Sequence, residues 1–146
     1  MKIEFSNLYK THKTHRKIIY RLKKLIEKNQ FIGGPELKSF EKNFCNYVGA
    51  KYCIGVANGT DALEIALESL KLKKGSEVIV PVNTWIATAS SVVRSGCKLV
   101  FCDINLNDYC IDIEDLKKKI SLKTKVIIPV HLYGHPAKLD QIKNIA

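Results

Sequence analysis

The sequence is short of acidic residues. It contains 14 Asp and Glu residues against 24 Lys and Arg residues, a formal net charge of +10. The lysines are spread along expected helix faces and ends, and they are not interleaved with aromatic residues as in single-strand binders. A solvated surface is therefore favoured over a nucleic-acid groove, and we expect no nucleic-acid partner. A second explanation stays open: if the chain is a fragment, its acidic complement lies in the rest of the protein.

Long apolar runs are also missing. Residues Met1 to Phe5 carry no apolar signal core, and the longest apolar runs, such as Val78 to Val82, cannot span a bilayer. With 146 residues, 46% of them hydrophobic, the chain is long enough for one domain with a core but too short for two typical domains. We therefore expect a soluble, cytoplasmic protein without a membrane partner, made of one domain or part of one.

The sequence lacks cysteine and histidine spacings that are typical of metal sites. No Cys-x-x-Cys pair occurs, and no histidine stands at metal-ligand spacing from a cysteine. No metal site is expected, and no flanking sequence indicates a catalytic thiol. The cysteines are predicted to be reduced thiols, mostly buried: Cys45, Cys53, Cys97, Cys102 and Cys110.

Short apolar runs alternate with helical patterns along the chain. Helices are predicted over about residues 13–28, 35–48, 60–70, 83–95, 112–119 and 138–146, and strands over about 53–57, 77–82, 98–103 and 125–130. In the second helix the predicted buried stripe is Leu37, Phe40, Phe44, Tyr47 and Val48. Such alternation is typical of right-handed crossovers and of an α/β fold with a mainly parallel sheet and helices on both faces.

The rest of the chain is organised around the stretch from Cys53 to Leu67. Its hydrophobic period changes from two to about 3.6 at Asn58-Gly59, which predicts a strand, a tight turn and a helix. Gly59 has no side chain where the backbone bends. At the start of the helix, the amides of Thr60 and Asp61 have no earlier carbonyl to bond with. A phosphate could accept those amides and the Thr60 hydroxyl, aided by the helix dipole. The alternative is an ordinary helix capped by Thr60 or Asp61, without a ligand.

Three loops are expected at one edge of the predicted sheet. Ligands of parallel sheets bind at the carboxyl ends of strands, and residues 58–61, 83–85 and 131–133 meet that description. The middle loop contains Trp85, the one tryptophan of the chain. A phosphate site and an aromatic platform together suggest a planar aromatic phosphate ester, and pyridoxal 5'-phosphate fits that description.

Four segments in the right order and spacing resemble the DegT/DnrJ/EryC1/StrS family of sugar aminotransferases. They are FIGGPELKSFEKNF, ANGTDALEIAL, VIVPVNTWIATASSV and KTKVIIPVHLYGHPAKLDQI. The likeness runs from about Phe31 to the last residue. It implies the N-terminal portion of the large domain of a fold-type-I pyridoxal-phosphate enzyme, with residues 1–30 as an N-terminal helical segment and 31–146 as an incomplete cofactor-binding domain. It also implies a homodimer whose active sites take residues from both subunits.

The resemblance assigns roles to particular positions. Gly59, Thr60 and Asp61 match the phosphate contacts, and Trp85 matches the aromatic residue stacked on the cofactor ring, a contact worth roughly 0.5 to 1.5 kcal/mol. The alternative for Trp85 is a core residue. His131 and Tyr133 are candidate substrate contacts, and the alternative is that they only shape their loop.

The resemblance also implies groups that do not occur within these residues. The family's acidic partner of the pyridine nitrogen and its Schiff-base lysine lie further along, so no catalytic residue is assigned. We expect an enzyme of amino-sugar or cell-surface polysaccharide biosynthesis that moves an amino group from an amino acid to a nucleotide-linked keto-sugar, with residues 1–146 inactive alone. The alternatives are a sugar dehydratase of the same family, in which histidine replaces the lysine, and a non-catalytic phosphate- or nucleotide-binding module.

Overall fold

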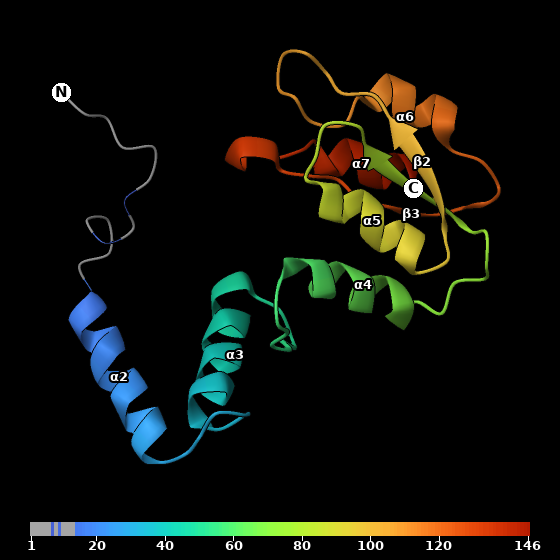
Figure 1. Cartoon of the computed structure of the whole chain (residues 1–146). Helices are drawn as coiled ribbons and strands as arrows, with labels where there is room; N and C mark the ends of the chain where they lie inside the picture. Colours follow the sequence, from blue (N-terminus) through green and yellow to red (C-terminus); the bar gives the residue numbers. More distant parts are fainter. Residues whose placement is uncertain (1–6, 8, 10–13) are drawn as a thin grey trace. The chain divides into compact units, whose positions relative to one another are not determined.

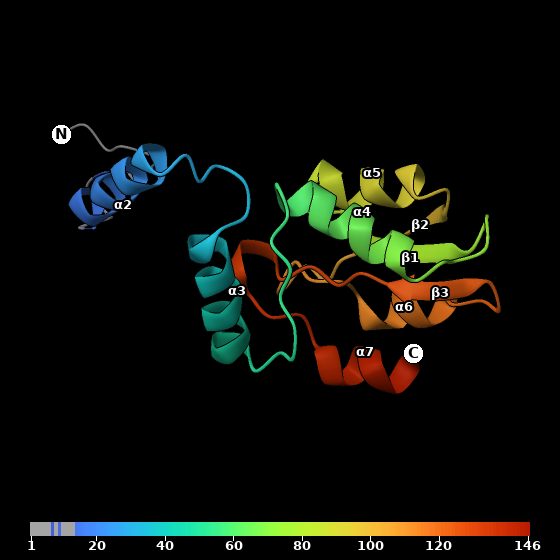
Figure 2. The same ribbon diagram turned by 90° about the horizontal axis from the view of Figure 1, so that it is seen from below.

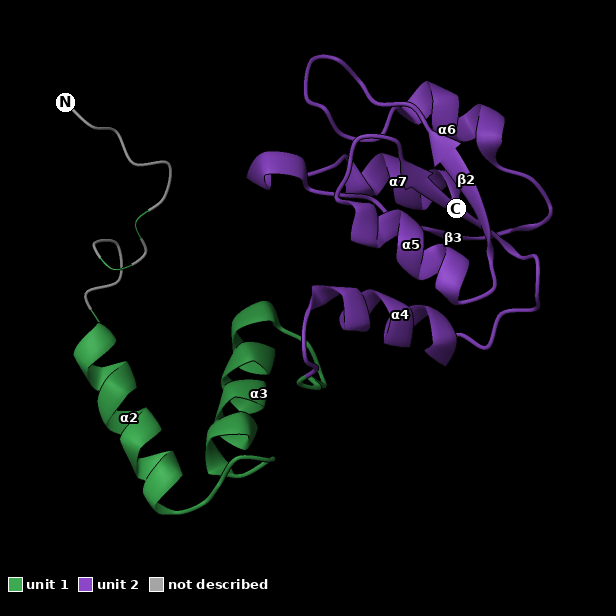
Figure 3. Cartoon of the chain, in the orientation of Figure 1, with its two compact units in different colours: residues 1–55 green, residues 56–146 purple. Residues whose placement is uncertain are grey.

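A computed structural model describes residues 7, 9 and 14–146. The predicted start of the first helix at Lys13 and the region Met1 to Phe5 lie outside the described residues. The chain divides into two compact units, residues 1–55 (unit 1) and 56–146 (unit 2) (Figure 3). The sequence predicts a different boundary, after residue 30, where the cofactor-binding domain is expected to begin. That domain boundary stays a prediction.

Unit 1 contains helices α2 (His15–Glu27) and α3 (Pro35–Val48) (Figure 1). Both helices were predicted, and the bounds of α3 are those expected from its two ends. Pro35 occupies the first helical turn, where its missing N–H costs nothing. Gly49 ends the helix in the left-handed conformation, with φ of 69°, which a residue without Cβ adopts without strain.

The predicted burial of the apolar stripe of α3 is wrong. All five of its side chains are exposed, Tyr47 at 86%, and no described residue of unit 1 is buried. Periodicity identifies the apolar face of a helix, but burial requires a second element packed on that face.

None of the helices in the described ranges is long and apolar enough to cross a membrane.

The strand predicted over residues 53–57 is also wrong. These residues form no ladder with any described strand, and Ile54 is 80% exposed. The Gly55 amide instead donates a hydrogen bond to Glu41 Oε1 on α3 at 2.9 Å. Alternating apolar residues suit a strand, but a strand also needs a neighbour that accepts its backbone hydrogen bonds.

Unit 2 alternates helices with strands as predicted. In order it contains α4 (Gly59–Ser69), β1 (Glu77–Pro81), α5 (Ile86–Arg94), β2 (Lys98–Cys102), α6 (Ile113–Lys119), β3 (Thr124–Ile127), the 3-10 turn η1 (Leu132–Gly134) and α7 (Leu139–Ile145). The strand order is β2-β1-β3, and both pairings are parallel. The predicted α/β class with a parallel sheet is confirmed.

Helices cover both faces of this sheet, as Figure 2 shows. Successive residues of a strand point to opposite faces. Val78 and Val80 therefore pack with Leu67 of α4 and Val92 of α5, whereas Ile79 packs on the other face in a cluster with side chains of α6 and α7. All five residues of β1 are buried, which places the core of unit 2 around this central strand.

All five cysteines are free thiols. The prediction that most are buried holds only for Cys102 and Cys110, because Cys45, Cys53 and Cys97 are half-buried. Burial, hydrogen bonding to Asp115 and the nearby acidic charges raise the pKa of Cys102 to about 12. This thiol is an inert part of the core.

Candidate active site

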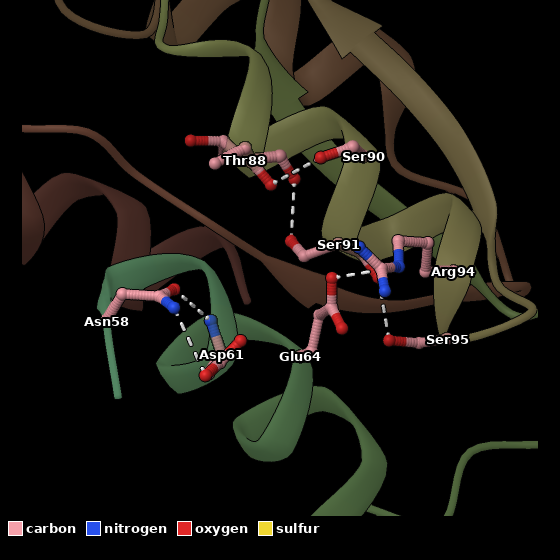
Figure 4. Close-up of polar contacts among 9 residues, drawn as sticks. Asn58, Asp61, Glu64, Thr88, Ser90, Ser91, Arg94 and Ser95 are labelled. Atoms are coloured by element: carbon pink, nitrogen blue, oxygen red, sulfur yellow. Dashed lines mark hydrogen bonds and ion pairs between the residues drawn. The ribbon is translucent and has the colours of Figure 1, made fainter. Parts of the chain in front are cut away.

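Helix α4 is capped by Asn58, not by Thr60 or Asp61 (Figure 4). The Asp61 amide donates to Asn58 Oδ1 at 3.0 Å, and Asn58 Nδ2 donates to Asp61 Oδ2 at 3.2 Å. The chain bends at Ala57 and Asn58, one position earlier than predicted. A sequence signal for this arrangement exists, since Asn is a preferred N-cap residue and Asp61 follows it by three positions.

The cap leaves two backbone donors at the start of α4. Within the described part of the chain, the amides of Gly59 and Thr60 and the Thr60 hydroxyl have no hydrogen-bond partner. A Cβ placed at Gly59 would meet nothing within 4 Å, so the approach to these donors is open. Because the Asp61 amide and one of its carboxylate oxygens are bonded within the cap, the free donors at this helix start are those of Gly59 and Thr60. The cofactor contact predicted for Asp61 stays a prediction.

Trp85 stands at the N-cap position of the neighbouring helix α5. Its side chain is 78% exposed, so the alternative that Trp85 is a core residue is wrong for this structure. The following turn is held by a hydrogen bond from the Thr88 amide to the Trp85 carbonyl at 3.0 Å and by the contact between the Thr84 and Thr88 hydroxyls at 3.0 Å. An exposed indole on a fixed backbone can present a flat face to a ligand.

Helices α4 and α5 pack against each other and begin at the same end of unit 2 (Figures 1 and 2). Glu64 Oε1 lies 3.1 Å from Arg94 Nε and joins the two helices (Figure 4). This oxygen has no hydrogen-bond partner among the described residues, so charge attraction carries the contact. The pairing of α4 with α5 brings Thr60 and Trp85, from separate segments, to the same end of unit 2.

His131 and Tyr133 follow β3, at the edge where β1 also ends. Both side chains are exposed. The Ala137 amide donates to His131 Nδ1 at 2.9 Å, so a neutral His131 imidazole carries its proton on Nε2. Tyr133 has a positive φ of 54°, inside η1. The loop predicted over residues 131–133 is thus part of a short, hydrogen-bonded turn whose two polar rings remain accessible.

Comparison with known proteins decides the family. The family model of the DegT/DnrJ/EryC1/StrS aminotransferase family matches residues 12–146. The chain belongs to this family. It is 39% identical over 145 residues to the dTDP-3-amino-3,6-dideoxy-alpha-D-galactopyranose transaminase of Aneurinibacillus thermoaerophilus, an alignment that covers 99% of this chain and 40% of that protein. The resemblance predicted from four segments is confirmed.

Solved structures of relatives agree with this membership. The structure of DesV from S. venezuelae matches with a TM-score of 0.95 and 32% identity, covering 99% of this chain and 39% of that one. The E. coli GDP-4-keto-6-deoxy-D-mannose-3-dehydratase with bound hydrated PLP matches with a TM-score of 0.80 and 33% identity, covering 84% of this chain and 33% of that one. The chain therefore spans about two fifths or less of the relatives it matches.

Lysines in the described part of the chain are all exposed. Burial is one of the settings that activate a lysine nucleophile, and none of these side chains is buried. Within the same residues, no three His, Cys, Asp or Glu side chains gather closely enough to hold a metal ion. The donors and the aromatic ring described above fit an aromatic phosphate ester better than they fit a metal ion.

Proposed function

We propose that this chain is the cofactor-holding part of a pyridoxal-phosphate-dependent aminotransferase that moves an amino group from an amino acid to a nucleotide-linked keto-sugar. The observation that carries the proposal is the family match over residues 12–146. The free donors of Gly59 and Thr60 and the exposed indole of Trp85 support it, because they suit a phosphate and a planar ring.

In this proposal the chain's own residues bind and orient the cofactor. The Gly59 and Thr60 amides and the Thr60 hydroxyl hold the phosphate at the positive end of the α4 dipole. Trp85 covers one face of the ring and keeps water from it, and His131 and Tyr133 contact the substrate. When bound, pyridoxal phosphate supplies an electron sink for the exchange of the amino group. The Schiff-base lysine and the acidic partner of the pyridine nitrogen belong to the rest of the enzyme.

The phosphate site is tested by Thr60→Val in the whole protein. Loss of a hydrogen bond to a charged group should weaken cofactor binding by roughly 1.5 to 3 kcal/mol, measured by titrating apoenzyme with pyridoxal phosphate. Thr14→Val is a matched control, because the Thr14 side chain makes no cap hydrogen bond. Equal affinities of the Thr60→Val variant and the unmodified protein would show that the phosphate binds elsewhere.

The ring platform is tested by two substitutions of Trp85. Trp85→Phe keeps a stacking face and Trp85→Ala does not, so cofactor retention after gel filtration should fall more in the alanine variant. Because the side chain is 78% exposed, neither change should lower the midpoint of thermal unfolding of the apoenzyme by much. Equal retention in both variants would contradict the stacking role.

A sugar dehydratase is a second candidate, because the E. coli dehydratase matches 84% of this chain. The serine-containing loop in the rest of the protein distinguishes the two: a final lysine supports the aminotransferase, and a histidine supports the dehydratase. A non-catalytic phosphate- or nucleotide-binding module is the third candidate. Assay of the whole protein with an amino acid and keto-sugar nucleotides separates the aminotransferase from the other two candidates, since only the aminotransferase produces an amino sugar.

The proposal also includes a cytoplasmic homodimer, a cofactor-binding domain that begins near residue 31, and a lack of activity in residues 1–146 alone. Light scattering of the whole protein tests the dimer. For the last point, the isolated chain is mixed with pyridoxal phosphate, reduced with borohydride and analysed by mass spectrometry. A stoichiometric adduct at one lysine, with amino transfer, would mean that a lysine within these residues does the chemistry.

A further inference from the structure

The segment that follows α3 turns back along the same helix. After the left-handed Gly49, the Ala50 amide donates to the Cys45 carbonyl at 3.0 Å, and the Gly55 amide donates to Glu41 Oε1 at 2.9 Å. The approach is close at Gly55, where an added Cβ would lie 2.6 Å from Leu37 Cδ1. Since Ala50 is bonded at Cys45 and Gly55 one turn earlier, the segment runs antiparallel to α3.

This path brings two thiols together. Cys53 lies between the two anchored positions, and Cys45 and Cys53 line the same open pocket of about 390 Å³. Both side chains are half-buried, so small reagents can reach them. Burial raises the pKa of the Cys53 thiol, and the adjacent Cys45 thiol and Glu41 raise it further. The two sulfurs are therefore near neighbours although eight peptide bonds separate the residues.

We propose that Cys45 and Cys53 form a dithiol site that closes to a disulfide by exchange with a low-molecular-weight disulfide such as oxidised glutathione. Nothing in the proposed aminotransferase activity uses either thiol. Cys102 and Cys110 are less suited to this reaction, because both are buried in the core of unit 2. Closure would fix residues 50–55 to α3 by a covalent bond in addition to the two hydrogen bonds.

The exchange proceeds in two balanced steps. The Cys45 thiolate attacks one sulfur of oxidised glutathione, the S–S bond of the reagent breaks, and one glutathione leaves as a thiolate. Cys53 then gives up its proton and attacks the Cys45 sulfur, expelling the second glutathione as a thiolate. Two protein thiols are oxidised and one small disulfide is reduced to two thiols, which take up the two protons.

Peptide mapping tests the site in the whole protein. The reduced protein is incubated with oxidised glutathione, remaining thiols are blocked with iodoacetamide, and the sample is digested with trypsin without reduction. Cleavage after Lys42, Lys51 and Lys71 separates the two cysteines, so the disulfide joins peptide 43–51 to peptide 52–71. This linked species should exceed any other cysteine pair by about tenfold, because thiols held together react at a high effective concentration.

Variants and a denatured sample decide whether the fold directs the reaction. Cys53→Ser should stop at a glutathione adduct on Cys45, whereas Cys97→Ser, which removes another half-buried thiol, should leave the linked species unchanged. In concentrated urea the preference for the Cys45–Cys53 pair should be lost. Separate glutathione adducts on Cys45 and Cys53 in the native protein, or the same yield of linked peptide with and without urea, would overturn the proposal.

Discussion

Units 1 and 2 are both built with amphipathic helices, but these helices differ in what they cover. In unit 2, α4 and α5 pack on one face of a parallel sheet and α6 and α7 on the other, so that Val78, Ile79 and Val80 are fully buried. In unit 1, no described residue is buried, and the apolar stripe of α3 is exposed. Similar sequence patterns thus lead to very different burial.

The difference teaches that the apolar face of an element is a local property, whereas a core is a property of pairs of elements. Strand β1 has a hydrogen-bonded neighbour on each side and helices on each face, so every one of its residues is enclosed. Among the described residues of unit 1, no sheet packs on the apolar faces of α2 and α3, and no side chain of either helix is buried. Substitutions of the same kind should therefore cost more stability in unit 2 than in unit 1.

The largest contrast should come from removing core volume. Ile79→Ala in the centre of β1 should lower the free energy of unfolding by about 2 to 5 kcal/mol, because it leaves a cavity in a closed core. Ile19→Ala in α2 is the matched control, and at this exposed side chain the cost should stay within about 0.5 kcal/mol. Urea denaturation of the whole protein measures both, and an equal loss at Ile19 would show that another part of the protein covers α2.

A second contrast concerns acid stability. Hydrogen bonds from Ser121 and Lys98 lower the pKa of the buried Glu77 below its usual value of 4.5. Its stabilising effect is therefore complete above about pH 4.5 and is lost as the pH falls through the lower folded-state pKa. Glu77→Gln should destabilise unit 2 at neutral pH and should flatten the fall in stability below pH 4.5.

The control for this experiment is Glu36→Gln in unit 1. Glu36 pairs with Arg21 at 3.6 Å, and both side chains are largely exposed, so the pair should contribute little. Unfolding midpoints are measured from pH 3 to 7 for both variants, a range of about four units around the pKa of a free carboxyl. The same acid profile for Glu77→Gln and the unmodified protein would contradict the assigned hydrogen bonds.

Helix caps should give a smaller contrast. Asp112 caps α6 by accepting a hydrogen bond from the Asp115 amide at 2.8 Å, whereas Thr14 precedes α2 without a side-chain cap. Asp112→Ala should cost about 1 kcal/mol, and Thr14→Ala only a few tenths. Hydrogen exchange of the first-turn amides measures each locally. A larger increase in exchange rate, relative to the unmodified protein, in α2 than in α6 would argue that Thr14 is the more important cap.

The smallest contrast is expected for ion pairs between helices. Glu64 and Arg94 join α4 to α5 at 3.1 Å with Glu64 only 17% exposed, and Arg21 and Glu36 join α2 to α3 with both partners in solvent. A double-mutant cycle should give a coupling near 1 kcal/mol for the first pair and near 0.2 kcal/mol for the second, about the limits for surface pairs. A larger coupling in unit 1 would reverse the comparison.

Local signals in the sequence predicted the elements that are determined locally. Pro35 and Gly49 gave the bounds of α3, and the continuous apolar run from Val78 to Val80 gave the buried strand β1. The strand proposed near Ile54 failed because pairing depends on a partner distant in the sequence, and here the backbone bonds to the Glu41 side chain instead.

The positions of the candidate residues agree with the sequence analysis, and their roles stay predictions. Thr60 and Trp85 are accessible where two helices begin, as the spacing of the motifs suggested. The cap was missed because Asn58 was read as part of the turn, although Asn is among the preferred N-cap residues. The contact of Cys45 with Cys53 could not be foreseen, since it depends on the return path of residues 50–55 along α3.

The central position of β1 has a consequence for the order in which unit 2 can assemble during synthesis. Glu77 pairs with Lys98 of β2 and with Thr124 of β3, so the first strand to leave the ribosome waits for two partners made later. Until β3 emerges, one edge of β1 has no hydrogen-bond partner and attracts other chains. We expect nascent chains arrested before Thr124 to be cut by protease within β1. Protection of β1 should appear once β3 has been released from the ribosome. Protection before that point would mean that β1 and β2 fold as a stable pair alone.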